Sequence, residues 1–161
     1  MKRLLAITVL VYLFFLLEFI LHNIFGKWAA PNFLLLLVIF FDLYLGIRYG
    51  LWAAIISGFL KDAFSLEPLG THVLAYTICA YLVIYMKKNF YQPGSKLSRT
   101  FVVFVNTVVY VFILTLVNSI DQPVDFKEIF FYVLLPEVIA TTVVATFVFR
   151  HLKNITLSLA L

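Results

Sequence analysis

The sequence contains few charged residues. Asp, Glu, Lys and Arg make up 12% of its 161 residues, whereas about 25% is usual in soluble domains. Hydrophobic residues make up 64%. A domain of this size has too little interior to hide so much apolar surface from water. The composition therefore excludes an ordinary soluble domain and indicates a protein embedded in a lipid bilayer.

Cysteine is almost absent as well. Cys79 is the only cysteine, which excludes an intramolecular disulfide and a cluster of thiolate metal ligands. Its apolar neighbours predict an inert thiol that faces lipid or packs inside the protein. The three histidines, His22, His72 and His151, lie on different segments without the spacing of metal ligands. Neither a glycine-rich phosphate loop nor a Ser/His/Asp grouping is present. We therefore predict no enzymatic activity, no cofactor and no metal.

Hydrophobic runs account for most of the chain. Four of the six runs approach the roughly 20 residues that a helix needs to cross a membrane, and the second and third are weaker. The runs are continuous and do not alternate, which favours helices over the strands of a barrel. We predict an all-α bundle of six transmembrane helices in a single membrane domain covering residues 1–161. The runs are 4–21, 31–47, 49–64, 69–86, 100–120 and 129–149.

Positive charges predict the orientation of these helices. An even number of spans with the N-terminus inside places nine basic residues in the cytoplasm and leaves Lys27, Lys61 and Lys127 outside. Both termini are then cytoplasmic. The basic residues form no blocks, which argues against a nucleic-acid partner. The nine are Lys2, Arg3, Arg48, Lys87, Lys88, Lys96, Arg99, Arg150 and Lys153.

Five ionisable residues lie within or at the ends of the hydrophobic runs. An ionised side chain costs several kcal/mol at such depth unless it is paired, protonated or hydrated, so each marks a possible functional site. We expect Glu18, His72, Glu137 and Asp62 to form a polar cluster in the outer half of the bundle. Asp42 lies nearer the inner end of its run.

Each of these residues also has a structural interpretation. Glu18 and Asp62 can hydrate or pair with a neighbour such as Lys61, although we expect the Lys61 ammonium to reach the outer headgroups. Asp42 can pack against Arg48 or bind a neighbouring helix. Glu137 follows a proline in mid-span, which allows a role in the bundle, a subunit contact, or a ligand or proton site.

The third run carries small residues four positions apart. Ala53 is followed by Ser57, and Ala54 by Gly58. Small residues let the backbones of membrane helices approach closely. We therefore expect this helix to lie at the centre of the bundle and to be buried by the others.

Three segments together resemble the bacterial rod shape-determining protein MreD family. They are Pro31-Asn32-Phe33-Leu34, Arg48-Tyr49-Gly50, and the stretch 58–70 that contains Asp62 and Pro68-Leu69-Gly70. In this family a glycine-containing helix leads to an aspartate and then to a Pro-Leu-Gly turn that starts the next helix. The chain departs from the usual pattern at Asn32 and Lys61.

The resemblance implies a non-catalytic scaffold of the cell-elongation complex in the bacterial cytoplasmic membrane. Such a scaffold binds MreC, and through it helps couple the MreB cytoskeleton to the peptidoglycan-synthesising enzyme RodA and its transpeptidase. Asp62 and Gly70 are then expected to shape the Pro68-Leu69-Gly70 turn.

A second interpretation stays open, because the MreD family is similar in fold to the substrate-binding subunits of energy-coupling-factor vitamin transporters. Under that interpretation Glu18, His72 and Glu137 line a small-molecule pocket. The spans themselves favour the scaffold, since they offer few polar groups to recognise a polar ligand.

Overall fold

The computed structural model describes residues 2–25, 31–65, 68–92, 95–121 and 134–158. These residues form helices and contain no strand, which confirms the prediction of an all-α protein. Lys27, Lys127 and the start of the run 129–149 lie outside the described residues. The helices are α1 (Lys2–Phe25), α2 (Phe33–Tyr44), α3 (Ile47–Phe64), α4 (Thr71–Asn89), α5 (Lys96–Asp121) and α7 (Leu135–Ser158).

Three of the helices are long and apolar enough to cross a membrane. Their qualifying segments are Arg3–Ile24, Lys96–Ser119 and Leu135–Lys153, in α1, α5 and α7 respectively. In contrast, α2 has only 12 residues, or about 18 Å at 1.5 Å per residue. The crossing of the bilayer by α2, α3 and α4 stays a prediction.

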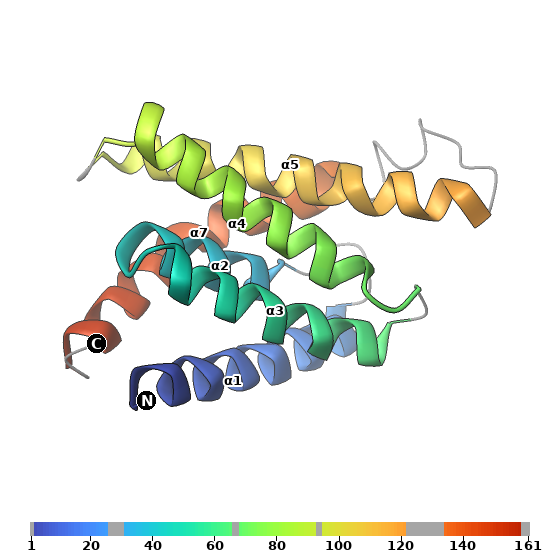
Figure 1. Cartoon of the computed structure of the whole chain (residues 1–161), viewed down its shortest axis with the longest axis horizontal. Helices are drawn as coiled ribbons and strands as arrows, with labels where there is room; N and C mark the ends of the chain where they lie inside the picture. The colour runs from blue at the N-terminus through green and yellow to red at the C-terminus, as the bar shows by residue number, and fades with distance from the viewer. Residues whose placement is uncertain (1, 26–30, 66–67, 93–94, 122–133, 159–161) are drawn as a thin grey trace.

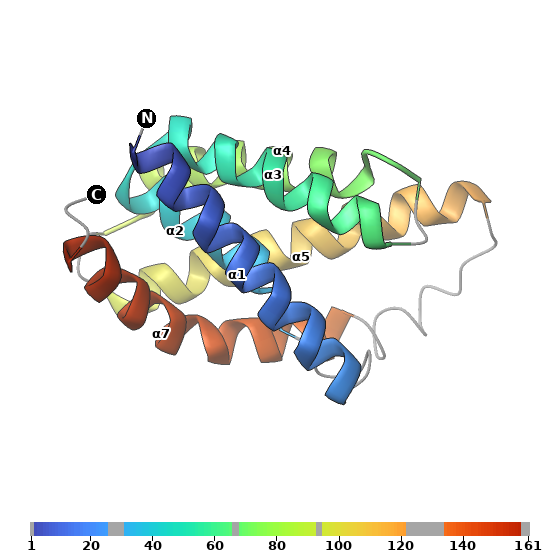
Figure 2. The ribbon, with the colours of Figure 1, turned by 90° about the horizontal axis from the view of Figure 1, so that it is seen from below.

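The short helix α2 lies at the centre of the bundle. Every residue from Phe33 to Leu43 is buried, and each of the other five helices contacts α2. Figures 1 and 2 show it enclosed between α3, α4, α5 and α7, with α1 crossing nearby. A helix that is hydrophobic around its whole circumference can be surrounded by protein in this way.

The sequence predicts α3 as the central helix, and the structure corrects this. Ala53, Ala54, Ser57 and Gly58 are buried, but the opposite face of α3 exposes large side chains such as Phe59. The buried small residues let α3 approach α4 closely: a Cβ atom on Gly58 would overlap the backbone of Val73. The small residues therefore mark a close helix pair, while the uniformly apolar α2 occupies the centre.

The lysines and arginines of the described helices, Lys61 excepted, gather at one end of the bundle, which we call the basic end. There α1, α3 and α5 begin, and α2, α4 and α7 end, so that both termini lie at the same end (Figure 1). We call the opposite end the far end. That the basic end faces the cytoplasm stays a prediction from the sequence. The basic residues at this end include Arg3, Arg48, Lys87, Lys88, Lys96, Arg99, Arg150 and Lys153.

Candidate functional site

A polar network surrounds the first turn of α2, inside the bundle. The Asn32 side chain caps the helix by accepting a hydrogen bond from the amide of Leu35 at 3.0 Å. The backbone amide of Asn32 donates to the hydroxyl of Thr141 on α7, at 3.1 Å. A helix start has amide groups without intrahelical partners, and hydrocarbon cannot supply any. These polar side chains therefore allow a half-length helix to begin within the protein.

Glu18 of α1 serves the same helix start. Its Oε2 accepts a hydrogen bond from the amide of Leu34 at 3.1 Å, and its Oε1 pairs with the Lys61 ammonium of α3 at 2.7 Å. The carboxylate thus faces the positive end of the α2 dipole and a cation together. The sequence left open whether Glu18 is hydrated or pairs with a neighbour such as Lys61, and the structure shows the ion pair with Lys61.

Lys61 points into the bundle, contrary to the expectation that its ammonium reaches the headgroups. Its Nζ lies 5.9 Å from the ring centroid of Tyr76 and 5.5 Å from that of Tyr110. The two rings are stacked, with centroids 5.1 Å apart. Glu18 and the aromatic faces together compensate the ammonium, which explains why the lysine does not need to extend to the surface.

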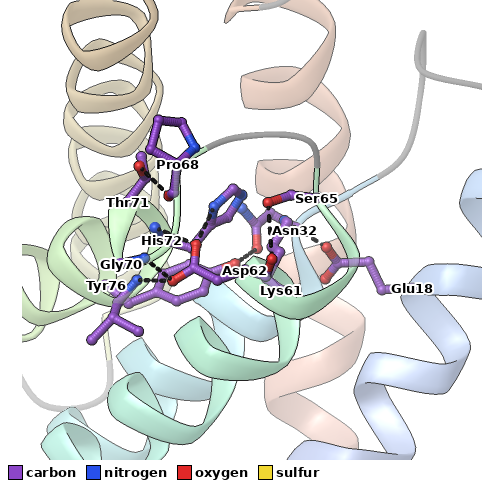
Figure 3. A network of polar contacts seen from close by, with 11 residues as sticks. Glu18, Asn32, Lys61, Asp62, Ser65, Pro68, Gly70, Thr71, His72 and Tyr76 are labelled. Atoms are coloured by element: carbon purple, nitrogen blue, oxygen red, sulfur yellow. Dashed lines mark hydrogen bonds and ion pairs between the residues drawn. The ribbon is translucent and has the colours of Figure 1, made fainter.

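Asp62 organises the connection between α3 and α4. Its carboxylate accepts hydrogen bonds from the amide of Gly70 at 3.0 Å and from the amide of His72 at 2.9 Å. The Nδ1 atom of His72 lies 3.1 Å from the same carboxylate. Figure 3 shows these contacts converging on Asp62. Asp62 therefore caps the start of α4 from the end of the preceding helix.

The turn before α4 needs glycine at its last position. Gly70 adopts φ +96°, a left-handed conformation that favours glycine. The Thr71 hydroxyl donates to the carbonyl of Pro68 at 2.8 Å, which holds the turn from its other side. Leu69 is 85% exposed at the tip. The Pro68-Leu69-Gly70 segment is thus a fixed turn that presents one apolar side chain.

Glu137 joins the network from the first turn of α7. Its Oε1 accepts a hydrogen bond from the Asn32 side-chain amide at 3.2 Å. The oxygen of the same Asn32 side chain accepts from the Tyr76 hydroxyl at 3.0 Å. Asn32 therefore links α2, α4 and α7 in one set of hydrogen bonds.

A cavity of about 460 Å³ opens beside this network. It is lined by Glu18, His72 and Glu137, the three residues that the vitamin-binding interpretation places in a pocket, together with Lys61 and Tyr110. Phenylalanines of α1 and α3 form its apolar side. Among the described residues no group of three or more His, Cys, Asp or Glu side chains is arranged to hold a metal ion.

Asp42 lies outside this cluster, as expected, and of its two predicted contacts the structure shows the one with a neighbouring helix, α3. It is fully buried near the basic end, and neither carboxylate oxygen has a hydrogen-bond partner among the described residues. Arg48 is exposed, so the predicted packing against it is corrected. Asp42 instead lies against Gly50, where an added Cβ would overlap its carboxylate.

Sequence reasoning missed four members of the network: Asn32, Tyr76, Tyr110 and Thr141. Asn32 carried a signal, since it starts an apolar run directly after a proline, in the position of a helix cap. Uncharged tyrosine and threonine are frequent in membrane helices, and nothing in their spacing indicates which of them meet.

Comparison with known families gives one match. The model of the family described as rod shape-determining protein MreD matches residues 1–155. No curated protein and no solved structure matches the chain.

Proposed function

The chain belongs to the MreD family of rod shape-determining membrane proteins, and from this membership we propose that it is a non-catalytic scaffold of the cell-elongation complex. The scaffold binds MreC. Through MreC it helps couple the MreB cytoskeleton to peptidoglycan synthesis by RodA and its transpeptidase.

The use of the intramembrane carboxylates is the observation that carries this proposal. Asp62 is 3% exposed, and its two oxygens accept backbone amides at the start of α4. Glu18 does the same for α2 and is neutralised by Lys61. Carboxylates used in this way hold helix ends in place. This use supports the proposal of a scaffold, because a scaffold depends on a fixed shape.

The far end offers a surface for a partner. The turn exposes Leu69, and Phe64 at the same end of the bundle, in the last turn of α3, is 66% exposed. An apolar side chain on a rigid turn suits recognition, because little conformational entropy is lost when a partner binds. We propose that MreC contacts this turn.

The location follows from the same proposal. The protein lies in the bacterial cytoplasmic membrane with both termini in the cytoplasm, and the far end faces the cell wall. The gathering of basic residues at the end that carries both termini supports this orientation.

Affinity purification of a tagged copy from native membranes tests the scaffold. We expect MreC and the wall-synthesis enzymes to co-purify with the wild type. Leu69→Ser should reduce MreC recovery, and the matched control Leu97→Ser should not, because Leu97 is equally exposed, at 84%, but lies at the basic end. Asp62→Ala and Gly70→Leu should also reduce recovery and disturb rod shape. Intact recovery and shape in all three far-end variants would overturn the proposed contact.

The far-end cavity keeps the second candidate function, a small-molecule binding subunit of a vitamin transporter. Its lining by Glu18, His72 and Glu137 supports that interpretation. Against it, Glu18 and Lys61 already compensate each other. Mass spectrometry of small molecules retained by the same purified protein distinguishes the two functions: a bound vitamin and an ATPase partner would replace the scaffold proposal.

A further inference from the structure

The basic end contains a second cavity, of about 350 Å³, between α5 and α7. Lys96 and Arg99 line it from the first turns of α5, and Arg150 and Lys153 line it from α7. None of its lining residues is acidic. Four cationic side chains around one cavity repel one another, and the positive end of the α5 dipole adds to their potential. The cavity therefore favours an anion.

The floor of this cavity is apolar. Val103, Ala145 and Phe149 form it and are at most 4% exposed. The hydroxyl-bearing side chains of Thr100 and Thr146 also line the cavity. A free inorganic anion has no apolar surface to bury against this floor. The combination suits an anionic group that is attached to a hydrocarbon chain.

The position of the cavity further restricts the chemical class of its ligand. It lies where the membrane-crossing segment of α5 begins, at Lys96, and where that of α7 ends, at Lys153. This is the depth at which lipid headgroups meet the hydrocarbon core. Basic pockets between membrane helices at this level are suited to phosphate-containing headgroups.

The arginines supply the geometry that a phosphate requires. A guanidinium can offer two parallel N–H donors to the oxygens of one phosphate group. Arg99 is oriented by α2, because its Nη1 donates to the Tyr44 hydroxyl at 3.4 Å. Arg99 thus connects the cavity with the end of the central helix.

We propose that this cavity binds the phosphodiester headgroup of an anionic membrane phospholipid, with an acyl chain lying along the floor formed by Val103, Ala145 and Phe149. Arg99 and Arg150 contact the phosphate, and Lys96 adds charge at the mouth. The site is independent of the far-end cavity and of the proposed contact with MreC, since it lies at the opposite end of the bundle.

Lipid binding to the purified full-length chain tests the proposal. Native mass spectrometry in a neutral detergent, with added phosphatidylglycerol, should show a bound lipid that phosphatidylcholine does not replace. The double variant Arg99→Gln/Arg150→Gln should bind phosphatidylglycerol at least about tenfold more weakly, because each basic residue near a headgroup contributes appreciably to anionic-lipid binding.

A matched control separates the cavity from general surface charge. Arg48→Gln/Lys88→Gln removes the same two charges from exposed positions at the basic end outside the cavity. Its binding should change less than about twofold. An equal loss in both double variants would overturn the site and leave only surface electrostatics.

A further variant tests the cavity without changing any charge. Thr146→Trp keeps all four basic residues and fills the space between α5 and α7, so that it should weaken phosphatidylglycerol binding like the arginine variant. It also keeps the proposal testable if the arginine variant does not fold. Wild-type binding by Thr146→Trp would overturn the proposal.

Two competing ligands distinguish the source of the phosphate. Inorganic phosphate should not displace the lipid at equal concentration, since it cannot use the apolar floor. Farnesyl pyrophosphate, which stands for polyprenyl carriers, should bind more weakly than phosphatidylglycerol. Preferential binding of either competitor would overturn the assignment to a phospholipid.

Discussion

Asp62 and Asp42 are buried aspartates on neighbouring helices, and each lies in the last turn of its own helix and close to the start of the next. Asp62 lies beside the start of α4 and accepts the amides of Gly70 and His72. Asp42 lies against Gly50 in the first turn of α3, but the Gly50 amide donates to the carbonyl of Gly46 and not to the carboxylate. The Lys87 ammonium lies nearby, but it donates to the backbone carbonyls of Asp42 and Leu43, at 3.2 and 2.6 Å, and not to the Asp42 carboxylate.

The difference shows what decides the role of a buried carboxylate. Both side chains are at most 3% exposed, so burial does not separate them. The hydrogen-bond donors do: backbone amides donate to Asp62 and Glu18, whereas Asp42 has no donor among the described residues. A carboxylate that accepts backbone amides therefore holds the fold together, whereas a buried carboxylate without a donor is costly to ionise.

The largest effect is expected from Asp62→Ala. The variant leaves the amide of Gly70 and the buried amide of His72 without their acceptor, and should lower the free energy of unfolding by about 3–5 kcal/mol. Circular dichroism during denaturation of the detergent-solubilised protein measures this loss. Asp62→Asn, which keeps one acceptor oxygen, should show a smaller loss. Wild-type stability in Asp62→Ala would contradict the claim that Asp62, unlike Asp42, stabilises the fold.

A smaller effect is expected from Lys61→Met. Removing the ammonium leaves Glu18 charged and mostly buried, and should cost about 2–3 kcal/mol, somewhat less than for a fully buried pair, because the Lys61 side chain is 26% exposed. The double variant Glu18→Gln/Lys61→Met should be more stable than Lys61→Met alone. A double-mutant cycle checks this, and simple additivity would show that the two residues are not coupled.

The smallest effect is expected from Asp42→Asn. No hydrogen bond of the described structure is lost, and asparagine is nearly the same size, so that the free energy of unfolding should stay within about 1 kcal/mol of the wild-type value. The same denaturation experiment, with Asp62→Asn as the comparison, measures it. A loss as large as that of Asp62→Asn would show that Asp42 has a partner of its own in the membrane.

Several features of the fold could be predicted from single residues and runs. The apolar runs indicated six helices, because a spanning backbone must satisfy its own hydrogen bonds. The basic residues indicated which ends of the helices lie together. Ionisable residues are rare in the apolar runs, and this predicted a cluster of Glu18, His72, Asp62 and Glu137. The structure places these four residues in one half of the bundle.

The pairing of these residues could not be predicted. Lys61 looked like a lysine that reaches the headgroups, since nothing in its own helix shows that Glu18 of α1 lies 2.7 Å away. The run 31–47 looked like a weak span, but α2 has only 12 helical residues. A helix of that length depends on capping groups from α1 and α7, which are distant in the sequence.

The sequence by itself determined the class of the protein, its helical segments and the separation of basic from apolar surface, because these follow from composition and from spacing along one chain. The tertiary structure alone decided that α2 is the centre, that Glu18 and Asp62 hold helix starts, and that Asp42 does not. The physical reason is that a buried charge is stabilised by the few groups within hydrogen-bond distance, and packing brings those groups from other helices.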